Sequence, residues 1–578
     1  MKKHSKAIRF AASLFAVALV ATACGGSDDE ATEDTTAEET AAEAASYPTL
    51  EQCGEVSYDY TQPASAGGMT VTYDINPDAV WDDGSPITAA DFKATWEASL
   101  NTPGSVVTGG YDQIVSVEAG SSDKQVVVDF KTVYGPWRLL FSGLLKASAL
   151  ENPSDISTLF QDTLPFSARP WKMKSWSPEQ AVFVPNENYW GEDKPAEKEL
   201  VMVGFADSDT ELAAIKAGEV DFIYPQKFGG IDEALADPNI ETKTAFGSDV
   251  EAFYFQSKCG PFADPVYREA FSKSIDREAI LQQIYVPLGA DSLLQCGPIA
   301  PGPFCAENAW ANSYDPEGAK QLLEDNGWSL NADGFWADAN GNVPEVRWVI
   351  NIGNTRRENT QAYLIPLLTK AGFNVRTDNS EREIVFGKRL PGMDFDMAMY
   401  ISTAYSDPGY LTSSFACDKI PTTANNNVGG NNTGWCSKEA SDLLYQADAE
   451  TDPAKRAALV KEALVVMETG KFMLPLIQFP ILGAWRTDKV GGPVKDDIGN
   501  FMAFGNNHLW TDTDGDGKVV IGAEQWAACL NPVTECATSS WMVWTTINQV
   551  LPGAFFTKTD GSFYATNLLA KEPTVVIN

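Results

Sequence analysis

Histidine is nearly absent from this chain. Only His4 and His508 occur among its 578 residues, which excludes His-based catalytic triads, His-rich zinc sites and most designs that use a general base. The sequence also lacks GxSxG, GxxxxGK[ST] and GxGxxG motifs in a strand-to-helix context. We therefore expect no enzyme, no catalytic residues and no catalytic cofactor.

Positive charge is scarce as well. The chain has 42 Lys and Arg against 79 Asp and Glu, a formal net charge of −37. Nucleic acids are bound through clusters of Lys and Arg that neutralise phosphates, so we expect no nucleic-acid partner. Solubility is the simplest use of such a charge.

No CxxC pair occurs, which argues against redox catalysis and zinc ribbons. Eight of the nine cysteines follow Cys24, and an even number in an oxidising compartment favours four disulfides. Short spacing predicts Cys296 with Cys305, Cys417 with Cys436, and Cys529 with Cys536, which leaves Cys53 with Cys259 by elimination.

The first segment has the pattern of a secretory signal. Lys2, Lys3, Lys6 and Arg9 precede an uncharged run, 10–23. A run of that length is too short to span a bilayer core of about 30 Å. We expect residues 1–23 to be a signal peptide and the rest of the chain to work outside the cytoplasm.

The signal ends in small residues directly before a cysteine. The stretch 20–24 resembles a bacterial lipobox, which implies that Cys24 becomes the lipidated N-terminus. The alternative is an ordinary signal peptide with a coincidental cysteine. Residues 24–46 contain eight acidic residues and no Lys, Arg or aromatic residue, so we expect a disordered acidic tether to the membrane.

The folded body begins with a recognisable strand, turn and helix. The alternation in 69–75 predicts a half-buried strand. The stretch 80–92, VWDDGSPITAADF, contains an Asp-Gly turn and a helix start at Thr88 with Asp91 three residues on. This stretch closely resembles the signature of the oligopeptide/dipeptide/nickel family (family 5) of solute-binding proteins of ABC transporters.

Further segments resemble that family in the same order along the chain: 126–130 with 134–137, 186–191, 215–221, 261–270 and 274–277. The resemblance implies an α/β, two-lobed, type II periplasmic-binding-protein-like fold. Two hinge strands, near 251–256 and 473–479, would join the lobes. Lobe I would comprise 47–260 and 481–578, and lobe II would comprise 261–480.

The last ninety or so residues resemble segments that the family usually carries at its N-terminus. They are 518–522, 529–532, 547–555 and 568–577. A circular permutation accounts for this order, because domain termini often lie close together at the surface. It predicts a strand at 574–577 beside 69–75. The alternatives are a truncated second copy or an error of gene assembly.

An acidic turn lies where, in a permuted chain, the usual C-terminus of the family would be joined to its usual N-terminus. Asp512, Asp514 and Asp516 form a D-x-D-x-D-G pattern, as in the first half of an EF-hand calcium loop. The twelfth loop position is Ala523, and Glu524 comes one residue late. The turn is therefore either a structural Ca²⁺ site or a solvated acidic turn.

The resemblance also implies a ligand site between the lobes. Asp407 is the candidate partner for the ammonium group of a peptide, or else a turn residue that caps the next helix. The further candidates for the cleft lining are Tyr405, Tyr410, Trp541, Trp544 and Gln549. Core packing is the alternative for any single aromatic residue among them.

These features predict a monomeric, extracytoplasmic lipoprotein. It would be anchored in the periplasm or on the outer face of the plasma membrane, and would pass an oligopeptide or similar solute to an ABC permease. The alternative is a sensor, receptor or secreted enzyme on the same fold, because fold alone does not decide function.

Overall fold

The computed structural model describes residues 58–63, 67–225, 236–403, 407–425, 429–498, 504–524, 526–534, 536, 541–558 and 562–578. The chain divides into two units, 1–45 and 46–578, and every described residue lies in the second. The predicted signal peptide, Cys24 and the tether thus lie outside the described residues. Within the described part, no helix is long and apolar enough to cross a bilayer.

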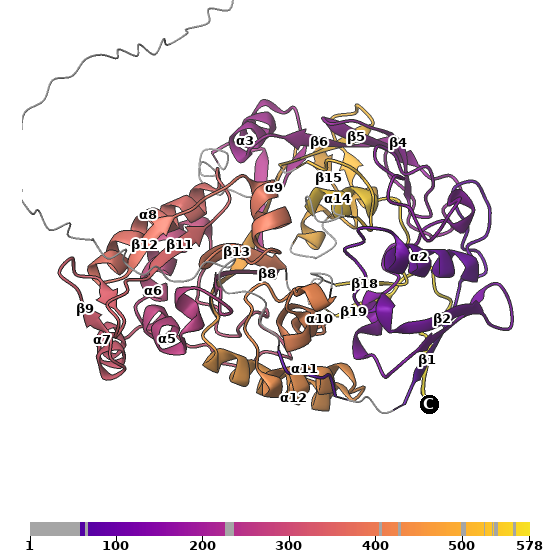
Figure 1. The fold of residues 1–578 in the computed structure, drawn as a ribbon. Coiled ribbons are helices and arrows are strands. Elements are labelled where there is room, and N and C mark those ends of the chain that lie inside the picture. Colours follow the sequence, from indigo (N-terminus) through magenta and orange to yellow (C-terminus); the bar gives the residue numbers. More distant parts are fainter. Residues whose placement is uncertain are drawn as a thin grey trace, which may run out of the picture. The chain divides into compact units, whose positions relative to one another are not determined.

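A four-stranded antiparallel sheet brings the last strand of the chain beside the first described one (Figure 1). Its order is β2-β3-β1-β20, with β1 (Met69–Asp74), β2 (Ile114–Ala119), β3 (Gln125–Phe130) and β20 (Thr574–Ile577). In β1 every second residue is buried, as the alternation predicts. Met69 lies opposite Ile577, and Thr72 opposite Thr574. The predicted pairing of the C-terminal strand is therefore confirmed.

Helix α2 (Ala89–Asn101) packs against this sheet and begins as the sequence predicts. The Asp91 carboxylate accepts a hydrogen bond of 2.8 Å from the backbone N–H of Thr88. Asp91 also accepts one from the backbone N–H of Ala147, so the same carboxylate caps the helix and fixes a loop of the chain.

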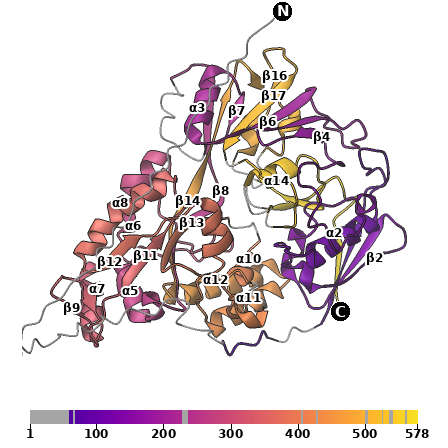
Figure 2. The same ribbon diagram turned by 45° about the horizontal axis from the view of Figure 1, so that its top comes forward.

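The largest sheet has ten strands in the order β12-β11-β13-β8-β14-β7-β17-β6-β5-β4. Strands β8 and β14 are its longest and run side by side along most of their length (Figure 2). The bounds are β4 (Trp171–Trp176), β5 (Gln180–Pro185), β6 (Glu199–Phe205), β7 (Phe222–Ile223), β8 (Ile240–Phe255), β11 (Glu345–Val349), β12 (Asn374–Thr377), β13 (Met397–Thr403), β14 (Met473–Arg486) and β17 (Lys518–Glu524).

Helices cover both faces of this sheet. They are α3 (Ser208–Ala217), α5 (Pro265–Lys273), α6 (Arg277–Ile280), α7 (Pro316–Asp325), α8 (Thr355–Lys370), α9 (Arg382–Ile384), α10 (Tyr410–Phe415), α11 (Lys438–Asp448), α12 (Pro453–Thr469) and α14 (Trp541–Ile547). Short two-stranded antiparallel sheets pair β9 (Ser329–Leu330) with β10 (Trp336–Ala337), β15 (Val490–Gly491) with β16 (Thr511–Asp512), and β18 (Phe555–Thr557) with β19 (Phe563–Ala565).

The end of β8 is buried on both sides, as expected for a strand covered by helices on each face. Phe253 and Phe255 belong to a core shared with α5, α7 and α8. Ala252 and Tyr254 point the other way, into a core shared with α10, α11 and α12. One strand thus joins the two layers of helices in lobe II.

Strand β17 lies between β6 and β7 and runs parallel to both. Its Val519 and Ile521 join the large core of lobe I, and Val520 faces α3 on the opposite side. A segment from the end of the chain thus completes a sheet built from residues far earlier. The pairing of β20 with β1 is the one that the permutation predicts; the permutation itself stays a prediction.

Three of the predicted disulfides are confirmed: Cys296–Cys305, Cys417–Cys436 and Cys529–Cys536. Cys259 is disulfide-bonded too. Its predicted partner Cys53 lies outside the described residues.

Candidate functional site

Strands β8 and β14 carry the chain between the two parts of the large sheet. β13 pairs with β8 from Asp249 to Phe255, whereas β7 pairs with β14 at Ala484 and Trp485. The change from one part to the other falls where the β8–β14 register shifts, between Gln478 and Pro480. The predicted hinge segments 251–256 and 473–479 thus lie in the lobe II ends of these two strands.

A buried ion cluster fixes the hinge strand β8 to lobe II. Glu251 is fully buried and accepts hydrogen bonds from Arg356 Nη2 at 2.7 Å and Arg357 Nε at 2.8 Å. Burial alone would raise the pKa of Glu251, but the two guanidinium groups hold it below its ordinary value. The Arg356 guanidinium also lies 4.5 Å from the ring centre of Phe479 in β14. The N-terminus of α8 is therefore bound to both hinge strands.

Asp407 has a cationic partner within the chain. Its two carboxylate oxygens accept hydrogen bonds from Arg456 Nη1 and Nη2 at 2.6 and 2.7 Å. One of these oxygens also accepts a hydrogen bond from the backbone N–H of Gly409, just before α10. This turn contact is the second of the two roles that the sequence offers for Asp407. Binding a ligand ammonium group would require Asp407 to exchange its partner.

The Asp407–Arg456 pair continues to a second acid, Asp448, which is partly buried. Asp448 Oδ1 lies 3.8 Å from Arg456 Nη2. Burial raises the pKa of Asp448 to about 7, against the lowering effect of Arg456. The cluster thus holds two acids beside one arginine, and this excess of negative charge is relieved when Asp448 takes up a proton as the pH falls below about 7.

Lobe I approaches this cluster closely at two glycines. A Cβ atom on Gly135 would lie 2.9 Å from the backbone oxygen of Asp448, and one on Gly409 would lie 2.2 Å from Pro136 Cγ. Tyr134 is next to this contact, and burial with the nearby Asp448 and Asp407 raises its pKa well above the ordinary value. The close approach of these segments leaves no room for a Cβ atom at either position.

The remaining cleft candidates fall into two groups. Tyr410 donates a hydrogen bond of 2.5 Å to the backbone oxygen of Pro298 inside lobe II. Gln549 is buried in lobe I, where its Oε1 accepts a hydrogen bond of 3.0 Å from Asn507. Core packing, the alternative that the sequence leaves open, accounts for the contacts of both. Tyr405 and the side chains of Trp541 and Trp544 lie outside the described residues.

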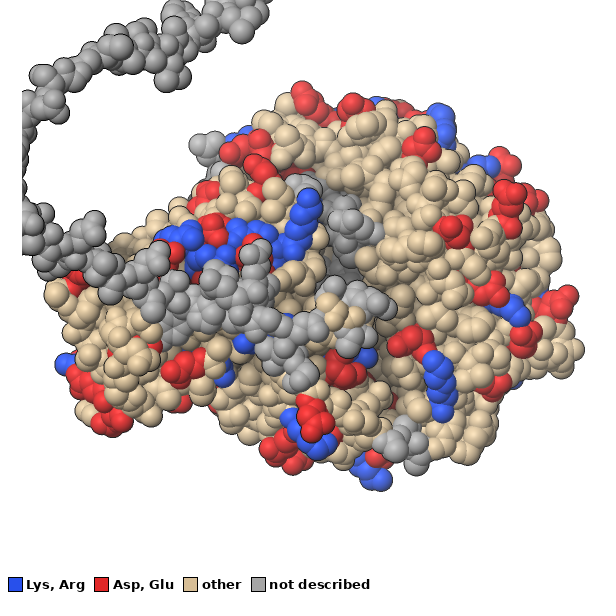
Figure 3. Space-filling view, in the orientation of Figure 1, with Lys and Arg blue, Asp and Glu red and all other residues tan. Residues whose placement is uncertain are grey.

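Basic side chains gather on lobe II in the region of β11, β12 and α9, and the surface is hollowed beside them (Figure 3). Arg347 contacts Asp394 at 2.7 Å and Asp396 at 3.1 Å, while Arg376 contacts Glu345 at 2.7 Å. Arg389 contacts Asp378 and Asp394 in the same network. These ion pairs tie the strands of this sheet edge together.

The acidic turn of lobe I brings its three carboxylates close together. One oxygen each of Asp512, Asp514 and Asp516 lie within 4.8 Å of one another. Asp512 accepts hydrogen bonds from the backbone N–H groups of Asp514 and Gly515, and Lys489 lies 2.8 Å from Asp514. This geometry suits a solvated turn as well as a Ca²⁺ loop, so calcium binding stays a prediction.

Sequence reasoning missed both buried ion clusters. The adjacent arginines 356 and 357 at the start of α8 are a local signal for the Glu251 cluster only, since two neighbouring cations that become buried require a counter-charge. The acid itself, Glu251, lies about a hundred residues earlier in the chain, and spacing does not indicate such a pairing.

Comparison with known proteins gives matches to solute-binding proteins of bacteria. Residues 59–421 match the model of the bacterial extracellular solute-binding proteins, family 5. The oligopeptide-binding protein OppA of Bacillus subtilis is 25% identical over 434 residues, which cover 69% of this chain and 75% of that protein. A putative ABC transporter peptide-binding protein of Brucella ovis is 25% identical over 499 residues, covering 82% of this chain and 87% of that protein.

Solved structures show the same fold. The periplasmic EDTA-binding protein EppA superposes with a TM-score of 0.66 at 22% identity, covering 77% of this chain and 85% of its own. The oligopeptide-binding protein AppA of Bacillus subtilis, solved with a nonapeptide, gives a TM-score of 0.62 at 20% identity, with 77% and 87% covered. One of these proteins is named for EDTA and the other for oligopeptides, so the likeness defines the two-lobed architecture and not the solute.

Proposed function

Because this chain belongs to the bacterial extracellular solute-binding proteins of family 5, we propose that it captures a peptide-like solute between its lobes and delivers it to an ABC permease. The match over 59–421, more than half of the chain, carries this proposal. The family is one of solute-binding proteins that act outside the cytoplasm. Peptide is the proposed class because the relatives OppA and AppA are named for oligopeptides.

The two hinge strands supply the movement that the function needs. Closure about two strands is a common way for a two-lobed protein to enclose a ligand. We propose lobe I as 47–260 with 481–578 and lobe II as 261–480, so that both crossings fall in β8 and β14. Tyr405, Trp541 and Trp544 remain the proposed cleft aromatics.

The attachment to the cell is part of the proposal. Lipidation at Cys24 would hold a monomer on the membrane through the acidic tether, so that the released solute stays near its permease. A diacyl group at Cys24 would make this anchor stable, since a single chain binds only marginally. Mass spectrometry of the membrane-extracted N-terminal peptide tests the modification.

A thermal-shift screen tests the solute class. The body from residue 47 onward would be screened against di- to hexapeptides, sugars and nickel chelates. A ligand at about a hundred times its dissociation constant stabilises the folded state by about 2.7 kcal/mol. A shift with peptides supports the proposal. A shift only with sugars or chelates would show that the solute belongs to that class and not to the peptides. Turnover of a ligand would favour the alternative of an enzyme.

A further inference from the structure

Two tyrosines that precede β1 lie against lobe II. Tyr58 donates a hydrogen bond of 2.8 Å to the backbone oxygen of Gly434, and Tyr60 donates one of 3.1 Å to Asp442 Oδ1 in α11. Burial raises the pKa of Tyr58 to about 12. The neighbouring residues Asp59 and Thr61 are exposed, so this extended segment directs alternate side chains to the surface of lobe II.

The ring of Tyr60 is held from two sides. It stacks on Tyr445, with ring centres 6.5 Å apart and planes 15° from parallel. The Lys438 ammonium group lies 5.3 Å from its ring centre, in the position of a cation–π contact. Tyr445 in turn donates a hydrogen bond of 2.7 Å to Asp418. Tyr60 therefore occupies a seat built by about two turns of α11, from Lys438 to Tyr445.

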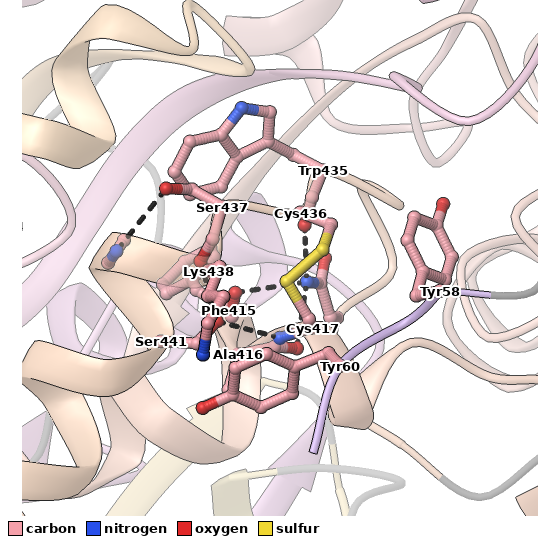
Figure 4. The surroundings of a disulfide bond; sticks show 12 residues. Tyr58, Tyr60, Phe415, Ala416, Cys417, Trp435, Cys436, Ser437, Lys438 and Ser441 are labelled. Atoms are coloured by element: carbon pink, nitrogen blue, oxygen red, sulfur yellow. Dashed lines mark hydrogen bonds between the residues drawn. A yellow bond between two sulfur atoms is a disulfide. The ribbon is translucent and has the colours of Figure 1, made fainter. Parts of the chain in front are cut away.

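A disulfide stiffens this seat (Figure 4). Cys436 precedes α11 and is bonded to Cys417, and the backbone N–H of Cys417 donates a hydrogen bond of 3.1 Å to Ser441 Oγ in α11. Tyr58 and Tyr60 both lie beside this bond in Figure 4. Gly434, the acceptor for Tyr58, is two residues from Cys436. The surface that receives the tyrosines is thus fixed covalently.

The same segment then passes to lobe I. The backbone N–H of Asn578 donates a hydrogen bond of 2.9 Å to the oxygen of Gly68, one residue before β1. Tyr60 and Gly67 are seven residues apart, so a fully extended chain between them spans about 25 Å at most. A third covalent connection therefore runs between the lobes, in addition to β8 and β14.

We propose that residues 58–63 form a strap that is fastened to lobe II through Tyr58 and Tyr60 and limits how far the lobes separate. While Tyr60 stays seated, opening that moves its seat more than about 25 Å from Gly67 is prevented by chain length. Wider opening requires the strap to leave lobe II. Residue 58, where the described part of the chain begins, consequently lies against lobe II, although β1 belongs to lobe I.

Cleavage by chymotrypsin after Tyr58 and Tyr60 tests the seating on the full exported chain. The variants Tyr445→Ala and Asp442→Asn change the seat and leave both cleavage sites intact. Each should be cut roughly ten-fold faster at these two tyrosines, because cleavage follows the population of the released strap. The matched controls on the same helix are Gln446→Ala and Glu439→Gln, which are exposed and should be cut at the parent rate.

A distance measurement tests the limit on opening. Spin labels at Val115 in β2 and Val465 in α12, both exposed, report the separation of the lobes without ligand. Longer distances should appear in Tyr445→Ala and not in Gln446→Ala. Equal cleavage rates in all four variants would overturn the seating, and unchanged distances would overturn the limit on opening. Neither readout involves a solute, so both are independent of the proposed function.

Discussion

Arg456 donates hydrogen bonds from both terminal nitrogens of its guanidinium group to the carboxylate of Asp407. About nine-tenths of each side chain is buried. Asp407 is the acid that the sequence offers as a ligand anchor, and its negative charge is thus balanced by Arg456 within lobe II. Such a pair is costly to break from one side, because the partner that remains is a buried and unpaired charge.

A double-mutant cycle tests this pairing. Arg456→Met should lower the free energy of unfolding in urea by about 3–5 kcal/mol, because it leaves Asp407 unpaired. The double variant Arg456→Met/Asp407→Asn should lose less than the sum of the two single changes. Arg376→Gln at an exposed pair is the control and should cost about 1 kcal/mol or less. Strict additivity of the two changes would contradict the pairing.

The hinge cluster gives a second prediction. Glu251→Gln leaves Arg356 and Arg357 without their buried counter-charge, so unfolding in urea should require about 3–5 kcal/mol less. Glu345→Gln, which removes an exposed partner of Arg376, serves as its control and should cost about 1 kcal/mol or less. A loss at Glu251 no greater than that at Glu345 would show that the cluster does not fix α8 to the hinge.

The raised pKa of Asp448 implies that the stability of the folded state depends on pH. Its pKa is about 7 in the folded chain and 3.8 in the reference state, so the folded state keeps a proton that the unfolded state releases. The stabilisation of the folded state by this proton is complete below about pH 4, and it is lost as the pH rises through 7. Asp448→Asn should therefore gain stability relative to the parent between pH 4 and 7, by up to about 4 kcal/mol.

Urea unfolding at several pH values measures this gain. Asp325→Asn, at the exposed end of α7, is the matched control and should follow the parent at every pH. If the difference between Asp448→Asn and the parent stayed constant from pH 4 to 8, the raised pKa of Asp448 would be wrong.

The acidic turn predicts a response to calcium. If Asp512, Asp514 and Asp516 form a Ca²⁺ site, millimolar Ca²⁺ should raise the melting temperature of the parent. Asp514→Asn should abolish the rise, since one of the three carboxylates is then neutral. Mg²⁺ is the control ion, because it loses its water less readily. Equal melting temperatures with Ca²⁺, Mg²⁺ and a chelator would leave the turn as a solvated one.

The parts of the structure that local sequence determines could be predicted. The capping of α2 by Asp91 and the three short-range disulfides depend on residues close in the chain, where few pairings compete. The pairing of β20 with β1 could also be predicted, because the C-terminal motif resembles the strand that normally precedes the Asp-Gly motif.

The parts of the structure that depend on contacts between residues far apart in the chain could not be predicted. Arg456 reaches Asp407 across 49 positions, and Tyr60 reaches Asp442 across 382. A charged or aromatic residue in the sequence does not indicate which of many partners it meets after folding. For the same reason Tyr410 and Gln549 could not be separated from core residues, and the contact of Tyr60 with lobe II could not be predicted.

Calorimetric titration of the body with the peptide that stabilises it most tests the proposed function most directly. The account predicts saturable binding of one peptide per chain, with the peptide recovered intact by mass spectrometry. Failure of every peptide to saturate the protein, or recovery of cleaved peptide, would contradict it.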